Sequence, residues 1–184
     1  MPFIKTDIPD LLIFEPRVFP DSRGYFFESY NEETCRAEGL DFQFVQDNQA
    51  QSSYGVIRGL HYQGGVHSQT KFIRALSGSI LDVVVDLRKN SATFGQSLSI
   101  ELSAENKLQL LVPKGFAHGY AVLSETAEVF YKVDTFYNKA SEAGIIYNDP
   151  GLKIDWKIKK EDHVISEKDL VLPTFEEIKN TSLF

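Results

Sequence analysis

The chain has 184 residues, of which 42% are hydrophobic and 24% charged, and its formal net charge is -7. This size and composition predict a single globular domain over residues 1–184. The acidic balance argues against a nucleic acid or an anionic membrane as partner, because both attract a surplus of Lys and Arg. No stretch is long and apolar enough to span a bilayer, and the amino end lacks a secretion-signal pattern, so we expect a soluble, cytoplasmic protein.

The first predicted element is a helix over residues 31–38, which Gly39 ends. It contains the only cysteine of the chain, Cys35, which therefore cannot form an internal disulfide. The segment around it is polar and offers no base beside the thiol. We expect a structural role for this cysteine.

The segment VIRGLHYQ, residues 56–63, is predicted to be a strand. Simple alternation would place Arg58 and His61 on opposite faces of it. Gly59 lies between them, and a glycine inside a strand often marks a bulge, where one extra residue resets the alternation. We therefore predict that Arg58 and His61 share one face.

Further strands follow, each bounded by turn residues such as Gly, Asn, Ser and Pro. They are expected over residues 80–88, 98–103, 107–113 and 128–134. Tyr131 is in phase with the valines on either side of it, and Lys71 is in phase with Ile73 and Ala75, so both polar groups are predicted to point inward. An inward lysine is unfavourable unless function uses it.

Helical character returns only near the carboxyl end, in a short segment over about residues 166–184 that includes Glu176 and Glu177. Many short strands with few helices predict an all-β fold, a sandwich or jelly roll with a few short peripheral helices.

The four histidines, at positions 61, 67, 118 and 163, do not form a metal-binding pattern. A jelly-roll metal site would show His-x-His with a nearby Glu and a later His. We therefore expect no metal, which leaves His61 available as a base with an unperturbed pKa near 6.5. The alternative for an isolated histidine is a core residue bonded to a backbone carbonyl. Several ionisable groups on predicted strands favour a functional site instead: Arg58, Lys71, His118 and Tyr131.

Seven segments closely resemble the dTDP-4-dehydrorhamnose 3,5-epimerase family, in unbroken order over nearly the whole chain. They are DSRGYFFESY (21–30), FVQDNQAQS (44–52), RGLHYQ (58–63), DVVVDLRKNSATFG (82–95), VPKGFAHGY (112–120), YKVDTFYN (131–138) and SEKDLVLP (166–173). The resemblance implies a cofactor-free, cupin-fold homodimer. Its expected reaction is inversion of C3 and C5 of dTDP-4-dehydro-6-deoxy-D-glucose, which gives dTDP-4-dehydro-L-rhamnose.

The resemblance also implies roles for individual residues. His61 matches the catalytic base, Tyr131 the acid, and Asp169 the carboxylate that orients the base. Lys71 and His118 match residues near the sugar. The remaining matches are anion contacts (Arg58, Lys168), nucleotide contacts (Gln46, Asn48), nucleotide contacts made in the partner subunit's site (Arg23, Glu28), and a thymine-stacking wall (Tyr137, Glu142).

Elementary chemistry fits these roles. A C–H beside a ketone is less acidic than a histidine by on the order of ten pKa units, so the enolate must be stabilised, and a desolvated Lys71 would donate to its oxygen. Inversion requires the proton to return on the opposite face, as Tyr131 on a different strand would allow. The orienting role of Asp169 rests on the family match alone, because the segment SEKD is equally typical of a helix start capped by Ser166.

The chain departs from the family pattern in the loop after RGLHYQ, where it has Gly64, Gly65 and His67, and again at Tyr147 and Lys157. None of these is a proposed catalytic residue, but the loop borders the sugar and would affect substrate preference. Three alternatives stay open: a single-site C3 or C5 epimerase or ketoisomerase, a sugar-nucleotide binding module without catalysis, and a metal-dependent jelly-roll enzyme.

Overall fold

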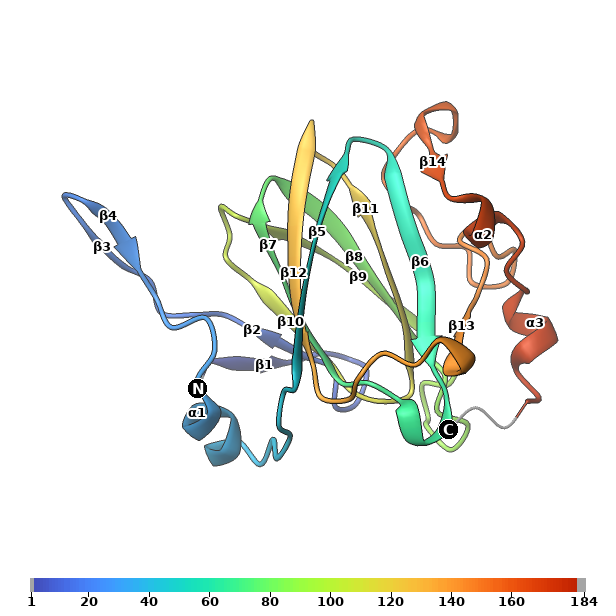
Figure 1. Cartoon of the computed structure of the whole chain (residues 1–184), viewed down its shortest axis with the longest axis horizontal. Coiled ribbons are helices and arrows are strands. Elements are labelled where there is room, and N and C mark those ends of the chain that lie inside the picture. Colours follow the sequence, from blue (N-terminus) through green and yellow to red (C-terminus); the bar gives the residue numbers. More distant parts are fainter. Residues whose placement is uncertain (1, 182–184) are drawn as a thin grey trace.

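The computed structural model describes residues 2–181, which form two facing β-sheets, a projecting hairpin and a few short helices (Figure 1). The first sheet has the order β1 (Phe3–Lys5), β2 (Leu12–Phe14), β10 (Gln109–Val112), β7 (Lys71–Ser77), β12 (Thr126–Val133) and β5 (Gln46–Ser53). The second has the order β13 (Glu142–Gly144), β6 (Val56–Gln63), β11 (Phe116–Val122), β8 (Ser79–Asp86) and β9 (Ser97–Ser103), and β14 (Val164–Ile165) also pairs with β6. The predicted all-β jelly-roll fold of the cupin type is confirmed.

The strands expected from alternation are present, with shifted ends. The prediction for residues 56–63 matches β6 throughout, and the one for 128–134 corresponds to β12, which begins at Thr126. The strand predicted over 107–113 is shorter and begins at Gln109, because Lys107 adopts a positive φ of 57° in the preceding turn.

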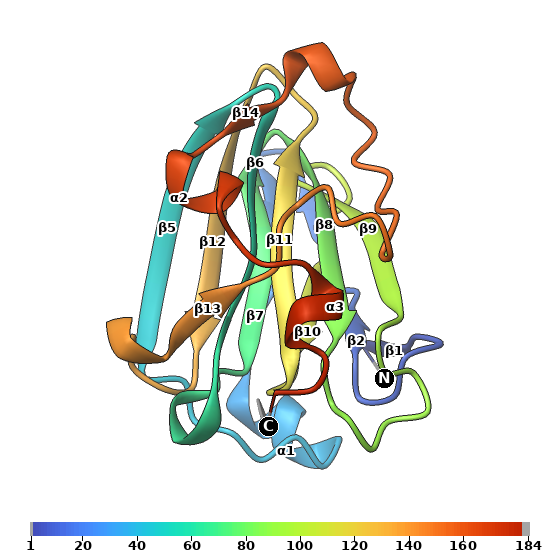
Figure 2. The same ribbon diagram turned by 90° about the vertical axis from the view of Figure 1, so that its right-hand side faces the viewer.

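Three apolar layers hold these elements together. Between the sheets lies a core that includes Ile73, Leu110 and Val129. The outer face of the second sheet is covered by the carboxyl-terminal segment, which packs Trp156 and Ile178 against it (Figure 2). On the outer face of the first sheet, aromatic rings contact one another, among them Phe14, Phe72 and Phe44. The outer face of each sheet is thus covered by other parts of the chain.

The helices are short and lie where the sequence indicates. Helix α1 (Glu32–Ala37) is capped by Asn31 and buries Cys35. Helices α2 (Glu167–Leu170) and α3 (Phe175–Ile178) begin after Ser166 and Thr174, whose hydroxyls accept backbone N–H groups. Single 3₁₀ turns lie at Gly65–His67, Lys139–Ser141 and Lys160–Asp162. The last part of the predicted helical segment, residues 182–184, lies outside the described residues. Within residues 2–181 no helix has the length and apolar character to cross a membrane.

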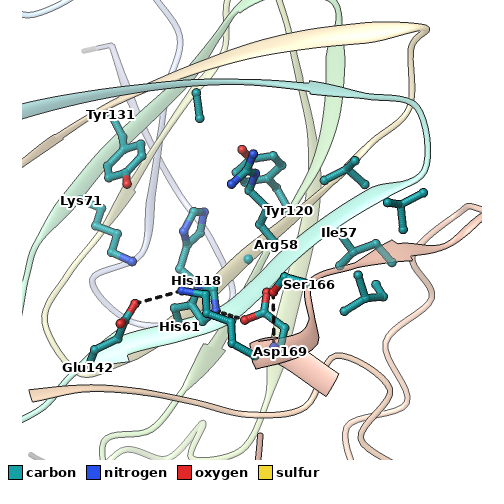
Figure 3. A pocket seen from close by; sticks show the side chains of 16 residues that line it. Ile57, Arg58, His61, Lys71, His118, Tyr120, Tyr131, Glu142, Ser166 and Asp169 are labelled. Carbon is teal, nitrogen blue, oxygen red and sulfur yellow. Dashed lines mark hydrogen bonds and ion pairs between the residues drawn. The ribbon is translucent and has the colours of Figure 1, made fainter. Parts of the chain in front are cut away.

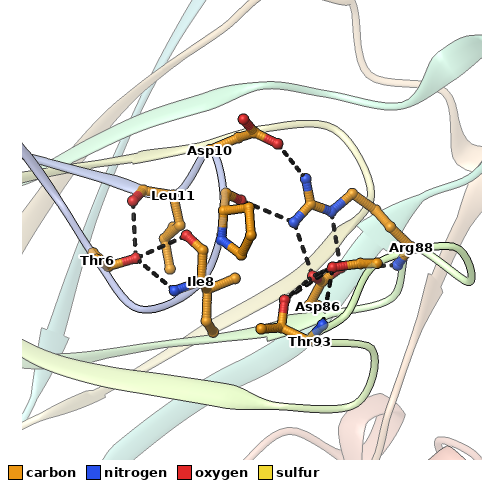
Figure 4. A network of polar contacts seen from close by, with 9 residues as sticks. Thr6, Ile8, Asp10, Leu11, Asp86, Arg88 and Thr93 are labelled. Atoms are coloured by element: carbon orange, nitrogen blue, oxygen red, sulfur yellow. Dashed lines mark hydrogen bonds and ion pairs between the residues drawn. The ribbon is translucent and has the colours of Figure 1, made fainter.

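A partly buried ion-pair network centred on Asp86 fixes the β1–β2 loop against the β8–β9 connection (Figure 4). Asp86 accepts from Arg88 at 2.8 Å and from the Thr93 hydroxyl at 2.7 Å. The same guanidinium donates to Asp10 at 2.7 Å. Several polar residues of the motif DVVVDLRKNSATFG therefore stabilise the fold and lie away from the interior cavity.

The predicted bulge in β6 is confirmed. His118 pairs with His61 and Tyr120 with Arg58, so two steps along β11 match three along β6. Gly59 has φ +119°, and a Cβ there would lie 2.6 Å from Gly119 Cα, so only glycine fits. The Gly59–Leu60 peptide bond is cis. The extra residue turns Arg58 and His61 toward the same interior.

Candidate active site

A cavity of about 490 Å³ opens between the two sheets. The second sheet contributes Arg58, His61 and His118 to its wall, and the first contributes Lys71 and Tyr131 from the neighbouring strands β7 and β12 (Figure 3). The inward phase predicted for Lys71 and Tyr131 is confirmed by this lining. Ionisable groups from both sheets thus face one interior.

His61 is held by a carboxylate from the carboxyl-terminal segment. Its Nε2 lies 2.7 Å from Asp169 Oδ1, and Asp169 is only 2% exposed. The Ser166 hydroxyl caps α2 by accepting the backbone N–H of Asp169, so the helix start and the pairing with His61 coexist. Because a carboxylate accepts, Nε2 carries the proton in the neutral ring and Nδ1 is the basic nitrogen.

Burial lowers the pKa of His61, and this effect outweighs the opposing influence of Asp169; the charge of Lys71 lowers the pKa further. The ring is therefore neutral, and able to accept a proton, in the neutral pH range. Burial also lowers the pKa of Lys71 to about 8, against the opposing charges of Asp82 and Glu142.

Tyr131 stands across the cavity from His61, on the opposite sheet. Burial raises the pKa of its phenol, the nearby Tyr120 raises it further, and the charge of Arg58 opposes both. The phenol thus keeps its proton at neutral pH. The basic nitrogen of His61 and the protonated phenol of Tyr131 thus face one cavity from opposite sheets.

A second histidine–carboxylate pair was not anticipated from the sequence. His118 Nε2 lies 2.9 Å from Asp82 Oδ2, and both residues are buried. Asp82 lies on β8, in the strand next to β11. The sequence does carry a signal for Asp82. This residue is two positions from Val84, so both side chains lie on the same, inward face of an apolar strand.

A smaller cavity of about 300 Å³ adjoins the first and shares His61, Lys71 and Tyr131 with it. Its outer wall contains four of the predicted nucleotide contacts: Gln46, Asn48, Tyr137 and Glu142. The Gln46 amide donates to Asn48 Oδ1 at 2.8 Å, and the Tyr137 hydroxyl donates to Glu142 Oε2 at 3.0 Å. Lys168 approaches Glu142 at 3.6 Å from α2. The structure therefore brings these predicted residues together beside the base.

Comparison with known proteins identifies the family of this chain. The family model described as dTDP-4-dehydrorhamnose 3,5-epimerase matches residues 5–177. The dTDP-4-dehydrorhamnose 3,5-epimerase of Pseudomonas aeruginosa is 53% identical over 169 residues, which cover 90% of this chain and 91% of that protein. The chain belongs to the dTDP-4-dehydrorhamnose 3,5-epimerase family.

Solved structures of the family have the same fold. The enzyme from Elizabethkingia anophelis aligns with a TM-score of 0.92 at 54% identity, over 96% of this chain and 97% of that one. A Legionella pneumophila RmlC, solved in complex with dTDP-4-keto-L-rhamnose, aligns with a TM-score of 0.93 at 42% identity, over 98% and 96% of the two chains.

Two residues that the family resemblance places at the nucleotide lie away from the cavity within this chain. Arg23 lies between the strands of the hairpin β3 (Phe19–Asp21) and β4 (Gly24–Phe26), and its side chain is 88% exposed and paired with Asp21. Glu28 follows the hairpin and accepts from Asn31 at 3.1 Å. Figure 1 shows this hairpin projecting from the sandwich.

The loop in which this chain departs from the family pattern is tied down. Gln63 donates to the His67 carbonyl at 2.7 Å and accepts from the Asn138 backbone at 2.7 Å. Tyr147, another departure, is buried, and its carbonyl accepts from Trp156. Across residues 2–181, no cluster of three or more His, Cys, Asp or Glu side chains converges as a metal site would require.

Proposed function

We propose that this protein inverts C3 and C5 of dTDP-4-dehydro-6-deoxy-D-glucose, as the names of its relatives indicate for those proteins. The observation that carries the proposal is that His61 and Tyr131 face each other across one cavity from two different sheets. Lys71 lines the same cavity, from the strand next to that of Tyr131. Inversion needs a base on one face of the sugar ring and a proton donor on the other.

In the first half of each inversion, His61 Nδ1 takes the proton from the carbon beside the ketone. The C–H electron pair forms the enolate double bond, and the carbonyl π electrons move to oxygen. Lys71 donates an N–H to that oxygen, where burial strengthens the interaction. Asp169 holds the imidazole in the tautomer that exposes Nδ1 and stabilises the imidazolium that forms.

In the second half, the enolate takes a proton from the Tyr131 hydroxyl on the opposite face, and the ketone re-forms. His61 then carries one extra proton and Tyr131 lacks one. Both groups return to their starting states by exchange with water. Each inverted carbon therefore ends with a solvent-derived hydrogen.

Deuterium incorporation tests this proposal directly. The protein is incubated with dTDP-4-dehydro-6-deoxy-D-glucose in deuterated water, and C3 and C5 are examined by NMR. We expect deuterium and inverted configuration at both carbons. Label at one carbon only would identify a single-site epimerase, and migration of the ketone would identify a ketoisomerase. Tight binding without any label would indicate a binding module that does not catalyse the reaction.

We further propose that the protein acts as a homodimer in which Arg23 and Glu28 complete the partner's nucleotide site. The hairpin that carries Arg23 exposes several large apolar side chains, Phe19 at 46%, Tyr25 at 59% and Phe26 at 65%. Such a patch on a projecting element supports burial against a second copy.

Subunit mixing tests the shared site. An Arg23→Gln chain and a His61→Asn chain are each expected to be nearly inactive. Mixed dimers of the two would contain one site with both residues intact, so mixing should restore up to about a quarter of wild-type activity at a statistical distribution. A monomer by sedimentation, or no recovery from mixed dimers, would contradict the proposal.

A further inference from the structure

Tyr120 lies in the cavity wall and has no assigned role in the proposed reaction. It extends from β11, in register with Arg58 on β6 and with Asp82 on β8. The residue is 5% exposed and lines the same cavity as His61 and Tyr131. Its position is therefore inside the site.

The hydroxyl of Tyr120 is buried and finds no hydrogen-bond partner of acceptable geometry among residues 2–181. Burial raises the pKa of this phenol, and the nearby Arg58 and Ser52 oppose that effect. Ser52 Oγ, however, accepts from Arg58 Nε at 3.1 Å and does not close a well-aligned bond with the phenol. An unpaired buried hydroxyl destabilises a fold, and a phenylalanine of the same shape would avoid that cost.

Arg58 is the side chain beside this hydroxyl on the cavity side (Figure 3). It is exposed, and among residues 2–181 its side chain donates to Ser52 at 3.1 Å and makes a long contact of 3.5 Å with the Gln51 carbonyl. A diphosphate entering the cavity would offer the guanidinium charged acceptors in place of these two neutral ones. Movement of the guanidinium toward these acceptors would uncover the Tyr120 hydroxyl next to the bound anion.

We propose that Tyr120 is a substrate-binding residue whose hydroxyl donates a hydrogen bond to an oxygen of the bound nucleotide sugar beside Arg58. This inference rests on the proposed function, since it takes the ligand to be a nucleoside diphosphate sugar. The acceptor is either a diphosphate oxygen or a sugar oxygen, and both present the same hydrogen-bonding chemistry.

The Tyr120→Phe variant separates this role from a structural one, because it removes only the hydroxyl. We expect its melting temperature to equal or exceed that of the wild type. We also expect the Kd of dTDP-glucose, which has no ketone and does not react, to rise about tenfold, as for a hydrogen bond to a charged or strong acceptor. A Kd within about twofold of the wild-type value would overturn the proposal, whether or not the melting temperature falls.

A second ligand identifies the acceptor. If the Kd of dTDP rises together with that of dTDP-glucose, the acceptor is a diphosphate oxygen; if only dTDP-glucose weakens, it is a sugar oxygen. Tyr54→Phe is the matched control, since Tyr54 lies in the turn after β5, is 43% exposed and lies outside the cavity lining, so neither Kd should change. These measurements need no turnover, so their failure is distinct from a failure of the deuterium experiment.

Discussion

The second sheet holds two histidine–carboxylate pairs on neighbouring strands, because His61 on β6 is the register partner of His118 on β11. They differ in their surroundings. The His61 side chain is 26% exposed and its carboxylate comes from α2, whereas the His118 side chain is 8% exposed and its carboxylate, Asp82, comes from the next strand of the same sheet. In the proposed reaction the more accessible pair transfers protons, whereas the more buried pair holds the cavity wall together.

The largest effect is expected for His61→Asn. The variant keeps the size of the side chain but removes the base, so hydrogen exchange at C3 and C5 should fall by at least about a hundredfold. Affinity for dTDP should stay near the wild-type value. Exchange measured by NMR at wild-type rates would remove His61 from the mechanism.

The enclosed pair should matter more for stability. Asp82→Ala leaves a buried histidine without its partner, and we expect the free energy of unfolding to fall by about 3 kcal/mol, roughly a hundredfold in the folding equilibrium. Asp169→Ala should lower it by only about 1 kcal/mol, because α2 is peripheral and His61 is partly solvated. Urea unfolding measures both values; equal losses would show that the contrast between the pairs is wrong.

The orienting role of Asp169 is tested by Asp169→Asn. The amide no longer favours the tautomer with Nε2 protonated and does not stabilise the imidazolium, so exchange should fall by about 10- to 100-fold while dTDP affinity is kept. The acid limb of the rate profile should also move to lower pH, since Asp169 raises the pKa of His61. An unchanged limb would indicate a purely structural carboxylate.

The smallest expected effect is the pH dependence of kcat/KM in the wild type. Because burial lowers the pKa of His61, activity should persist to more acidic pH than an ordinary histidine of pKa near 6.5 allows, and fall when the ring is protonated. The alkaline limb should lie near the Lys71 pKa of about 8, where the ammonium loses its charge. A flat profile through pH 8 would argue against a charged lysine at the enolate.

The same histidine makes stability depend on pH. Its pKa is lower in the folded than in the unfolded chain, so the unfolded chain binds more protons once the pH falls below about 6.5. Its contribution to stability is therefore complete above that pH and is lost as the pH falls toward the folded-state value.

The fold and several site positions follow from local patterns in the sequence. Period-two alternation predicts that Lys71 and Tyr131 face inward, and Gly59 predicts the bulge that turns His61 to the same side as Arg58. These predictions succeed because strand geometry depends on neighbouring residues alone.

Other features depend on the approach of distant segments, about which local patterns carry little information. Asp169 meets His61 across 108 positions of sequence, and only the family resemblance indicated that contact. Local patterns do not link Asp82 to His118 or place Tyr120 in the cavity, because β11 is buried on both faces and its alternation does not separate inside from outside.

The position of Asp169 has a consequence for the chain during synthesis. Both sheets, Lys71 and Tyr131 are encoded before residues 166–169, and this last segment adds Ser166, Lys168 and Asp169 to the cavity wall. A nascent or cleaved chain that ends before Ser166 would present an incomplete cavity wall and an unsupported histidine. Catalytic competence would then report that the last segment has been made and has packed against β6, and truncation at residue 165 should abolish hydrogen exchange.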